Sequence, residues 1–273
     1  MTYLRASYYY VAECQGRGLQ MKRLISACII AACIVGLIFA LIAVGNSGSS
    51  SAGEEESSEE MALESEETET ETESEEETET ETETETETEE ETEDPEDLID
   101  FDAELPYMIY VNRALNRVVV YGIDYDGNYT VPYLGFVCSC GEEEDSTPTG
   151  TFYTSDKYEW GYMQDGSYAQ YATRIHGGIL FHSVPYYSQS KDDLETEEYN
   201  KLGTDASLGC IRLAVIDAKW IYDNCPSGTC VVIYDDEDEE FEVEFRETIT
   251  IDLDSPYAGW DPTDPDEDNP WNS

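Results

Sequence analysis

Between residues 105 and 253 the chain alternates short apolar runs with polar turn residues, a pattern typical of β-strands. The runs are rich in Tyr, Val and Ile, which fit the pleated, half-buried surface of a sheet. An Asp-Gly-Asn sequence at 126–128 separates two of them and is a hairpin signal. The pattern predicts strands at Met108–Val111, Arg117–Tyr121, Tyr129–Val137, Thr151–Thr154, Ala172–Ile175, Ile179–Phe181, Thr229–Tyr234, Phe241–Phe245 and Ile249–Leu253.

A helical period interrupts this β pattern once, over Ala214–Asn224, and Cys225-Pro226 closes it. Residues 105–253 are therefore predicted to form one mainly β (α+β) domain, a β-sandwich-like arrangement with one or two short helices. A stretch of this length is long enough to bury a core of its own. Residues 254–273 are acidic and Pro-rich, and we expect them to form a loosely attached tail.

An uncharged apolar run of 22 residues, Leu24–Gly45, precedes this domain. As a helix it would be about 33 Å long, which matches the hydrocarbon core of a bilayer. Arg17, Lys22 and Arg23 come just before it, so the positive-inside rule places residues 1–23 in the cytoplasm and the rest of the chain outside. The run predicts a single-pass membrane anchor; the alternative is a cleaved signal peptide, whose apolar stretch is usually shorter.

The formal net charge of -50 is concentrated in a spacer between this anchor and the domain. Residues 54–97 carry 26 acids and no base, and Glu and Thr nearly alternate over residues 79–89. Because neither face of that alternation is apolar, residues 46–104 are predicted to be disordered, as an extended tether or, alternatively, a solubilising segment.

Residues 98–273 are acidic too, with 36 acids and nine bases. Phosphate binding needs clustered cations, so nucleic acid is excluded as a partner.

Five cysteines follow the predicted anchor, an odd number, so at least one keeps a free thiol or pairs with another chain. Cys225 and Cys230 flank a turn and could pair, whereas Cys138 and Cys140 are too close in sequence for a comfortable bridge. Cys210 differs because a glycine precedes it and permits a tight turn that exposes the sulfur. Such a turn would also aim backbone N–H groups at an oxyanion. The alternative is a small buried apolar residue.

A base for this thiol must be one of only two histidines, His176 and His182. If the segment between them is extended, about 20 Å separates them, so only one can serve Cys210. The same separation argues against a joint zinc site with the cysteines. His182 ends an apolar run and precedes Ser183, the placement expected of a catalytic residue at a strand end, although a lone histidine more often has a structural role.

These segments resemble the L,D-transpeptidases with a YkuD-type catalytic domain, which cross-link bacterial peptidoglycan. The resemblance covers residues 105–235 and is carried by Gly-Ile-Leu-Phe-His-Ser at 178–183, Ser-Leu-Gly-Cys-Ile-Arg-Leu at 207–213 and Thr-Pro-Thr-Gly-Thr-Phe at 147–152. Leu208 departs from the family, which commonly has histidine there. The interval from His182 to Ser207 is also longer than usual, with an acidic insertion around residues 188–200. The resemblance implies that residues 184–206 form a lid over the cleft, and we expect the insertion to reshape substrate access.

The residues and the resemblance together define a predicted site. Its members are the catalytic Cys210, His182 and Ser183, and the oxyanion or substrate-binding Gly209, Ser207, Arg212 and His176. Cys210 and His182 are expected to form a thiolate–imidazolium ion pair, and the resemblance implies that the Ser183 carbonyl orients the imidazole. The N–H groups of Gly209 and Cys210 would stabilise the oxyanion. Arg212 suits a substrate carboxylate, unless it is simply a surface arginine.

The resemblance implies that a tetrapeptide stem of peptidoglycan is the acyl donor and that an amine of a second stem is the acceptor. No metal or organic cofactor is expected. Two alternatives use the same cysteine, namely an L,D-carboxypeptidase and an enzyme that attaches protein to the wall. A third alternative is a non-catalytic wall-binding module with this fold. In each case the domain is expected in the cell-wall space, outside the cell membrane.

Overall fold

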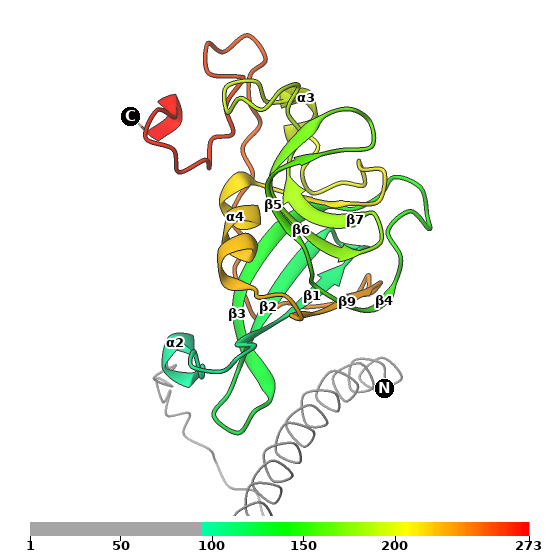
Figure 1. Ribbon diagram of the computed structural model, residues 1–273, viewed down its shortest axis with the longest axis vertical. Helices are drawn as coiled ribbons and strands as arrows, with labels where there is room; N and C mark the ends of the chain where they lie inside the picture. Colours follow the sequence, from blue (N-terminus) through cyan, green and yellow to red (C-terminus); the bar gives the residue numbers. More distant parts are fainter. Residues whose placement is uncertain (1–93, 273) are drawn as a thin grey trace, which may run out of the picture. The chain divides into compact units, whose positions relative to one another are not determined.

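Nine strands form one continuous, strongly curled sheet in the computed structural model, which describes residues 94–272 (Figure 1). Neighbouring strands follow the order β4-β9-β1-β2-β3-β8-β7-β6-β5. The strands are β1 (Tyr107–Asn112), β2 (Arg117–Ile123), β3 (Tyr129–Ser139), β4 (Gly150–Tyr153), β5 (Lys157–Tyr162), β6 (Tyr168–His176), β7 (Ile179–Ser183), β8 (Ile211–Leu213) and β9 (Cys230–Tyr234).

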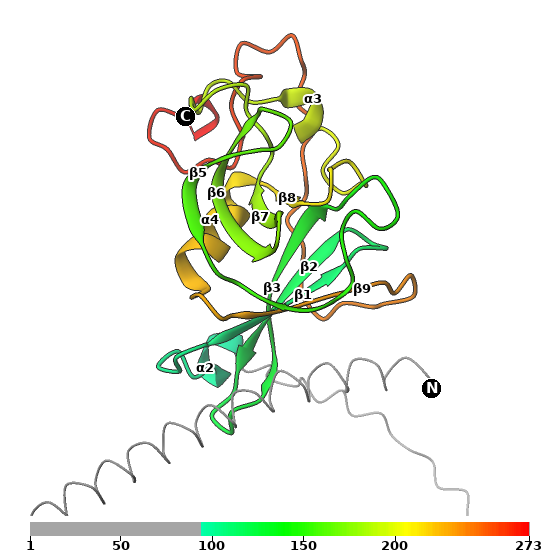
Figure 2. The ribbon, with the colours of Figure 1, turned by 45° about the vertical axis from the view of Figure 1, so that its right-hand side comes forward.

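The long strand β3 belongs to both halves of this sheet. Its Arg117↔Val137 pairing joins it to β2, and its last two residues, Cys138 and Ser139, pair antiparallel with β8. The two halves therefore wrap one core, to which helix α4 (Val215–Asn224) also contributes. Figures 1 and 2 show the curled sheet with α4 beside it. The predicted mainly β fold is present, in the form of one curled sheet around a shared core.

Helix α4 follows β8 after a single residue and faces that core. Val215, Ala218 and Ile221 are fully buried at a spacing of three residues, which is one face of a helix. The helix ends before Cys225-Pro226, because proline lacks the N–H that would continue it. The other helices of the described residues are short: α2 (Pro95–Leu98), α3 (Thr196–Tyr199) and the 3-10 turn η1 (Pro270–Asn272).

Seven of the nine predicted strands are present, and the last two predictions are wrong. Phe241–Phe245 alternates apolar and acidic residues but makes only one bridge, from Phe245 to Gly135, and Ile249–Leu253 forms no ladder. Two strands were missed. Strand β5 interleaves its aromatic residues with Lys157, Glu159 and Gly161, and β8 is only three residues long, too short for a period to show.

Both ends of the predicted domain are drawn too narrowly, because the described chain packs beyond them. Ile99 is buried against Gly122, where an added Cβ would collide with it, so ordered structure begins before residue 105. The tail is not loose, since Asp261 and Asp264 are fully buried in it. The predicted cytoplasmic segment, the anchor and most of the predicted spacer lie outside the described residues. Within residues 94–272, no helix combines the length and apolarity that a bilayer crossing requires.

Candidate active site

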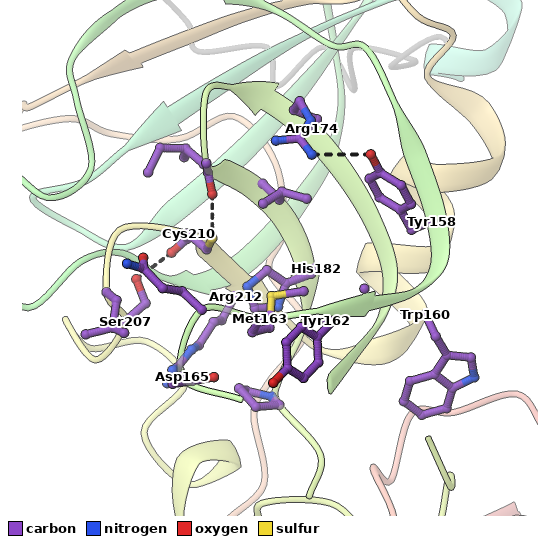
Figure 3. A pocket seen from close by; sticks show the side chains of 17 residues that line it. Tyr158, Trp160, Tyr162, Met163, Asp165, Arg174, His182, Ser207, Cys210 and Arg212 are labelled. Atoms are coloured by element: carbon purple, nitrogen blue, oxygen red, sulfur yellow. Dashed lines mark hydrogen bonds between the residues drawn. The ribbon is translucent and has the colours of Figure 1, made fainter. Parts of the chain in front are cut away.

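A cleft of about 690 Å³ opens along one face of the sheet and contains the predicted nucleophile and base. Most of its wall comes from three stretches, residues 158–165 of β5 and the following turn, residues 178–182 in and before β7, and residues 207–212 around the start of β8. Arg174 and Pro185 complete the lining. Figure 3 shows Cys210 and His182 facing this pocket, His182 from β7 and Cys210 from the loop just before β8. Strands β7 and β8 are parallel, which brings two segments nearly thirty residues apart in sequence side by side.

Cys210 is half-buried at the wall of the cleft, and its Sγ lies 3.5 Å from the Gly178 carbonyl oxygen. The loop before it needs glycine at position 209, where φ is +129° and an added Cβ would collide with the Ser146 carbonyl oxygen. Burial raises the pKa of the Cys210 thiol above its ordinary value, although a hydrogen bond from the Leu180 backbone opposes this. The thiol is therefore exposed enough to react but is protonated at neutral pH.

Ser207 shapes this loop from within. Its Oγ donates a hydrogen bond to the Cys210 carbonyl at 2.5 Å and accepts one from the Gly209 N–H at 3.0 Å. The hydroxyl is almost fully buried, so Ser207 supports the nucleophile although it also borders the cleft. The Gly209 N–H was predicted to stabilise an oxyanion, but it is already engaged by Ser207. The Cys210 N–H is left as the candidate donor from this loop.

Thr147 supports the same loop from the outside, and its role was not predicted. Its Oγ1 donates to the Gly209 carbonyl at 2.8 Å and accepts from the Gly141 N–H at 2.9 Å, and the side chain is buried. The hydroxyl thus ties residues 207–210, here called the nucleophile loop, to Gly141 just after the end of β3. The signal was present in the sequence as the first threonine of Thr-Pro-Thr-Gly, but only the fold brings it to Gly209.

His182 lies on β7 with only 2% of its surface exposed. Its Nδ1 is 2.5 Å from the Ser183 carbonyl oxygen, the contact that the resemblance implied. Because a carbonyl can only accept, we assign the proton to Nδ1 and a free lone pair to Nε2. Burial, with a smaller contribution from the Arg212 guanidinium, lowers the pKa of His182 to about 4. The imidazole is therefore a neutral base in the free protein.

The expected thiolate–imidazolium ion pair is not the resting state of this structure. Burial shifts both groups toward their neutral forms, raising the pKa of Cys210 and lowering that of His182. The sulfur interacts with the Gly178 carbonyl and the Leu180 backbone, and no hydrogen bond joins it to the imidazole among the described residues. The arrangement is instead that of a neutral thiol beside a neutral base.

Arg212 is buried at the cleft wall, so it is not the surface arginine that was the alternative. Its Nη1 donates to Glu198 Oε2 at 2.6 Å and to the Ala206 carbonyl at 2.9 Å. Glu198 lies in α3 and also pairs with Lys201. The positive charge at the cleft is therefore partly neutralised before any substrate arrives.

His176 is not part of the cleft, and its predicted place there is wrong. The residue is exposed, and its ring packs on Phe152 of β4 with the ring centres 5.2 Å apart. A register shift between Arg174 and His176 in the β6–β7 ladder is the reason. Such a bulge breaks the two-residue alternation that would have put His176 on the same face as Arg174, which does border the cleft.

The β5–β6 hairpin supplies cleft residues that the sequence reading missed. Tyr158, Trp160 and Tyr162 lie at alternate positions of β5, and all three border the cleft. Tyr162 is 72% exposed, and its ring packs on Tyr168 with the ring centres 5.3 Å apart. Asp165 follows in the turn, and Figure 3 shows it near Arg212. Their alternation was visible in the sequence, but not that this edge faces the cysteine.

Residues 184–206, expected to act as a lid, pack as a second core. Tyr186, Leu194, Tyr199 and Leu202 are buried there together with Ile251 from the C-terminal segment. Of this stretch, only Pro185 borders the cleft. The insertion is thus packed into the domain beside the cleft. Cys225 carries a free thiol, so the suggested pair with Cys230 is not formed, and Cys138 and Cys140 are also free.

Comparison with known proteins assigns this domain by sequence. Residues 106–233 match the YkuD family model, described as the L,D-transpeptidase catalytic domain. The chain is 47% identical over 96 residues to YciB of Bacillus subtilis (strain 168), a protein provisionally named as an L,D-transpeptidase. That match covers 33% of this chain and 48% of YciB, so the chain spans about half the length of this curated relative.

Two solved structures also show similarity. One is a fused Zn-dependent amidase/peptidase/peptidoglycan-binding domain-containing protein from Clostridium acetobutylicum, with 30% identity, a TM-score of 0.36, and coverage of 49% of this chain and 55% of that chain. The other is an L,D-transpeptidase from Mycobacterium tuberculosis, with 23% identity, a TM-score of 0.39, and coverage of 48% and 58%. The sequence matches, rather than these structural similarities, identify residues 106–233 as an L,D-transpeptidase-type catalytic domain.

Proposed function

We propose that this chain is a cell-wall L,D-transpeptidase that forms peptidoglycan cross-links through an acyl-enzyme on Cys210. One observation carries the proposal. A half-buried thiol and a buried imidazole with a free Nε2 border the same cleft, within a domain that matches this family. The donor would be a tetrapeptide stem, cut between its third residue and the terminal D-alanine.

The first step joins the Cys210 sulfur to the carbonyl carbon of the third stem residue. Since the thiol is protonated at rest, its proton passes to Nε2 of His182 while the carbon–sulfur bond forms. The carbonyl oxygen gains the negative charge, and the Cys210 N–H is the candidate to stabilise it. The imidazolium formed in this step keeps its Nδ1–H bonded to the Ser183 carbonyl, which favours the charged ring.

The second step breaks the bond between that carbon and the nitrogen of D-alanine. The imidazolium gives its proton to the departing amine, so the ring is neutral again and a thioester remains on Cys210. The amine of a second stem then attacks the thioester, its proton passes to His182, and the sulfur recovers that proton as it leaves. A histidine that is neutral at rest can serve as base in each attack and as acid in each departure.

We further propose that residues 24–45 anchor the chain in the cell membrane with the domain on the outer side. The uncharged run and the basic residues before it support this orientation. Fractionation of cells, with protease added to intact and to lysed cells, tests it. The domain should sediment with membranes and be cut from outside; a soluble domain, or one cut only after lysis, contradicts the proposal.

The reaction is tested by incubating the full chain with a purified muropeptide that carries tetrapeptide stems and analysing the products by mass spectrometry. A cross-linked dimer with release of D-alanine supports the proposal. A tripeptide alone would make the protein a carboxypeptidase, and no product would favour a wall-binding module. Cys210→Ala should abolish the reaction, whereas Cys225→Ala, which removes a buried free thiol at the end of α4, should retain it.

A further inference from the structure

The C-terminal segment lies beyond the matched domain, yet it buries two carboxylates against helix α4 and strand β6, which adjoin the segments that carry Cys210 and His182. Asp261 and Asp264 are both 0% exposed, whereas Asp266 and Asp268 in the same acidic sequence remain in contact with solvent. Burying a carboxylate is costly unless hydrogen bonds and opposite charge compensate. The partners of these two residues therefore show what the segment holds in place.

Asp261 caps helix α4, which begins directly after the strand that follows Cys210. The helix has Ala214 at its N-cap and thus no capping side chain of its own. Asp261 Oδ2 accepts the Val215 N–H at 3.0 Å, and Thr263 Oγ1 accepts the Ile216 N–H at 3.2 Å. A carboxylate is favoured at this end of a helix. The segment thus fixes the junction of β8 and α4.

Asp264 reaches the catalytic histidine through two intermediates. Its Oδ2 accepts Gln170 Nε2 at 2.9 Å. The backbone N–H of Gln170 donates to Ser183 Oγ at 2.8 Å, and the Ser183 carbonyl holds His182 Nδ1 at 2.5 Å. Gln170 and Ser183 are both buried, so this chain of contacts is shielded from water.

The turn that presents these carboxylates is itself held firmly. Asn269 Nδ2 donates to the backbone carbonyls of Asp261 and Asp264 at 2.9 and 2.8 Å. Lys191, from the insertion, places its Nζ 3.6 Å from Asp264 and 2.7 Å from Asp266. Asn269 and Lys191 therefore fix the position of the Asp264 carboxylate and stabilise its charge, as a support for a catalytic group requires.

We propose that residues 258–272 are a positioning element for the reaction and that Asp264 is its positioning residue. It holds Gln170 and thereby the Ser183 carbonyl, which keeps Nε2 of His182 directed at the cleft. The proposal rests on the proposed function only for the role of His182 as base. It assigns a task to a segment that the family match does not include.

The test uses the full chain with Asp264→Ala, Asp264→Asn and, as a matched control, Asp266→Ala. The control loses the shorter Lys191 contact but leaves Gln170 untouched. Alkylation of Cys210 by iodoacetamide is followed from pH 5 to pH 9 by mass spectrometry of the Cys210 peptide, with thermal unfolding measured alongside. Because the thiol is protonated at neutral pH, its alkylation there depends on a correctly placed base.

At pH 7, Cys210 of Asp264→Ala should be alkylated about 10- to 100-fold more slowly than Cys210 of the wild-type chain. The pH profile of Asp264→Ala should move toward the profile of His182→Ala, which lacks the base. Asp264→Asn, whose amide oxygen can still accept from Gln170, should lie between Asp264→Ala and Asp266→Ala. Asp266→Ala should match the wild-type chain. If Asp264→Ala does not fold, Asp264→Asn decides, and a rate below that of Asp266→Ala supports the proposal.

Equal profiles for the Asp264 variants and Asp266→Ala would overturn the positioning role. So would an equal loss in all three variants with lower unfolding temperatures, since that pattern is general loosening. Alkylation needs no stem peptide, which separates this proposal from the proposed function. A chain that forms no cross-link but shows the expected order of rates keeps the positioning role, and a cross-linking chain with equal rates loses it.

Discussion

Replacing Thr147 by valine tests whether the nucleophile loop is held in place from β3. Valine has nearly the same shape but no hydroxyl, so the change removes the hydrogen bonds to the Gly209 carbonyl and from the Gly141 N–H. An unpaired shielded polar group costs about 1–3 kcal/mol, and this change creates two. We expect the free energy of unfolding to fall by about 2–6 kcal/mol, a large part of the ~5–15 kcal/mol of a typical domain.

Urea unfolding of Thr147→Val and Thr147→Ser measures this effect. Serine keeps the oxygen and loses one methyl group, so it should cost about 1 kcal/mol, and the difference between the two variants isolates the hydrogen bonds. Turnover of the stem peptide should fall in Thr147→Val and largely persist in Thr147→Ser. If Thr147→Val is as stable and as active as Thr147→Ser, the Thr147 hydroxyl does not support the loop and the reasoning is wrong.

Three further predictions follow from the same contacts. Gly209→Ala should abolish activity and destabilise the domain by at least about 1–3 kcal/mol, measured by thermal unfolding, because position 209 needs a positive φ and has no room beside Ser146. Burial lowers the pKa of His182 to about 4, so the unfolded chain binds more protons than the folded chain between about pH 6.5 and 4. This residue therefore lowers the free energy of unfolding as the pH falls through that window. Unfolding of His182→Asn, measured across the same pH range, should lack that contribution. Burial raises the pKa of Asp217 to about 7, so between about pH 4 and 7 the folded chain binds a proton that the unfolded chain has lost. The free energy of unfolding therefore falls as the pH rises through that range. Asp217→Asn should flatten this slope and be more stable than the wild-type chain at pH 8, and an unchanged slope would contradict the prediction.

Most strands, and the two residues Cys210 and His182 that border one cleft, could be predicted from sequence, because both depend on local patterns. Apolar runs bounded by turn residues gave seven strands, and Cys210 and His182 stood out by residue type and by the motifs around them. What could not be predicted depends on contacts between distant segments. The β6 bulge that turns His176 away has no marker in the sequence.

The acidic C-terminal segment shows the same limit more sharply. Its composition is that of a solvated tail, and only the fold brings Asp261 to the start of α4 and Asp264 to Gln170. The Gly209 N–H illustrates a related limit, because it is free in an isolated turn but donates to the Ser207 hydroxyl in the folded loop. Local propensity predicts which segments are regular, whereas hydrogen-bond partners depend on tertiary structure.

The central claim is an acyl-enzyme on Cys210, formed with His182 as the base, and trapping that intermediate tests it most directly. The full chain is mixed with a tetrapeptide stem whose third-residue amine is blocked, so that it can donate but not accept, and the reaction is quenched in acid within seconds. Mass spectrometry should find the tripeptide acyl group on the Cys210 peptide, released by hydroxylamine, and far less of it in His182→Ala. An acyl group on another residue, or release of D-alanine without any modified Cys210, would contradict the account.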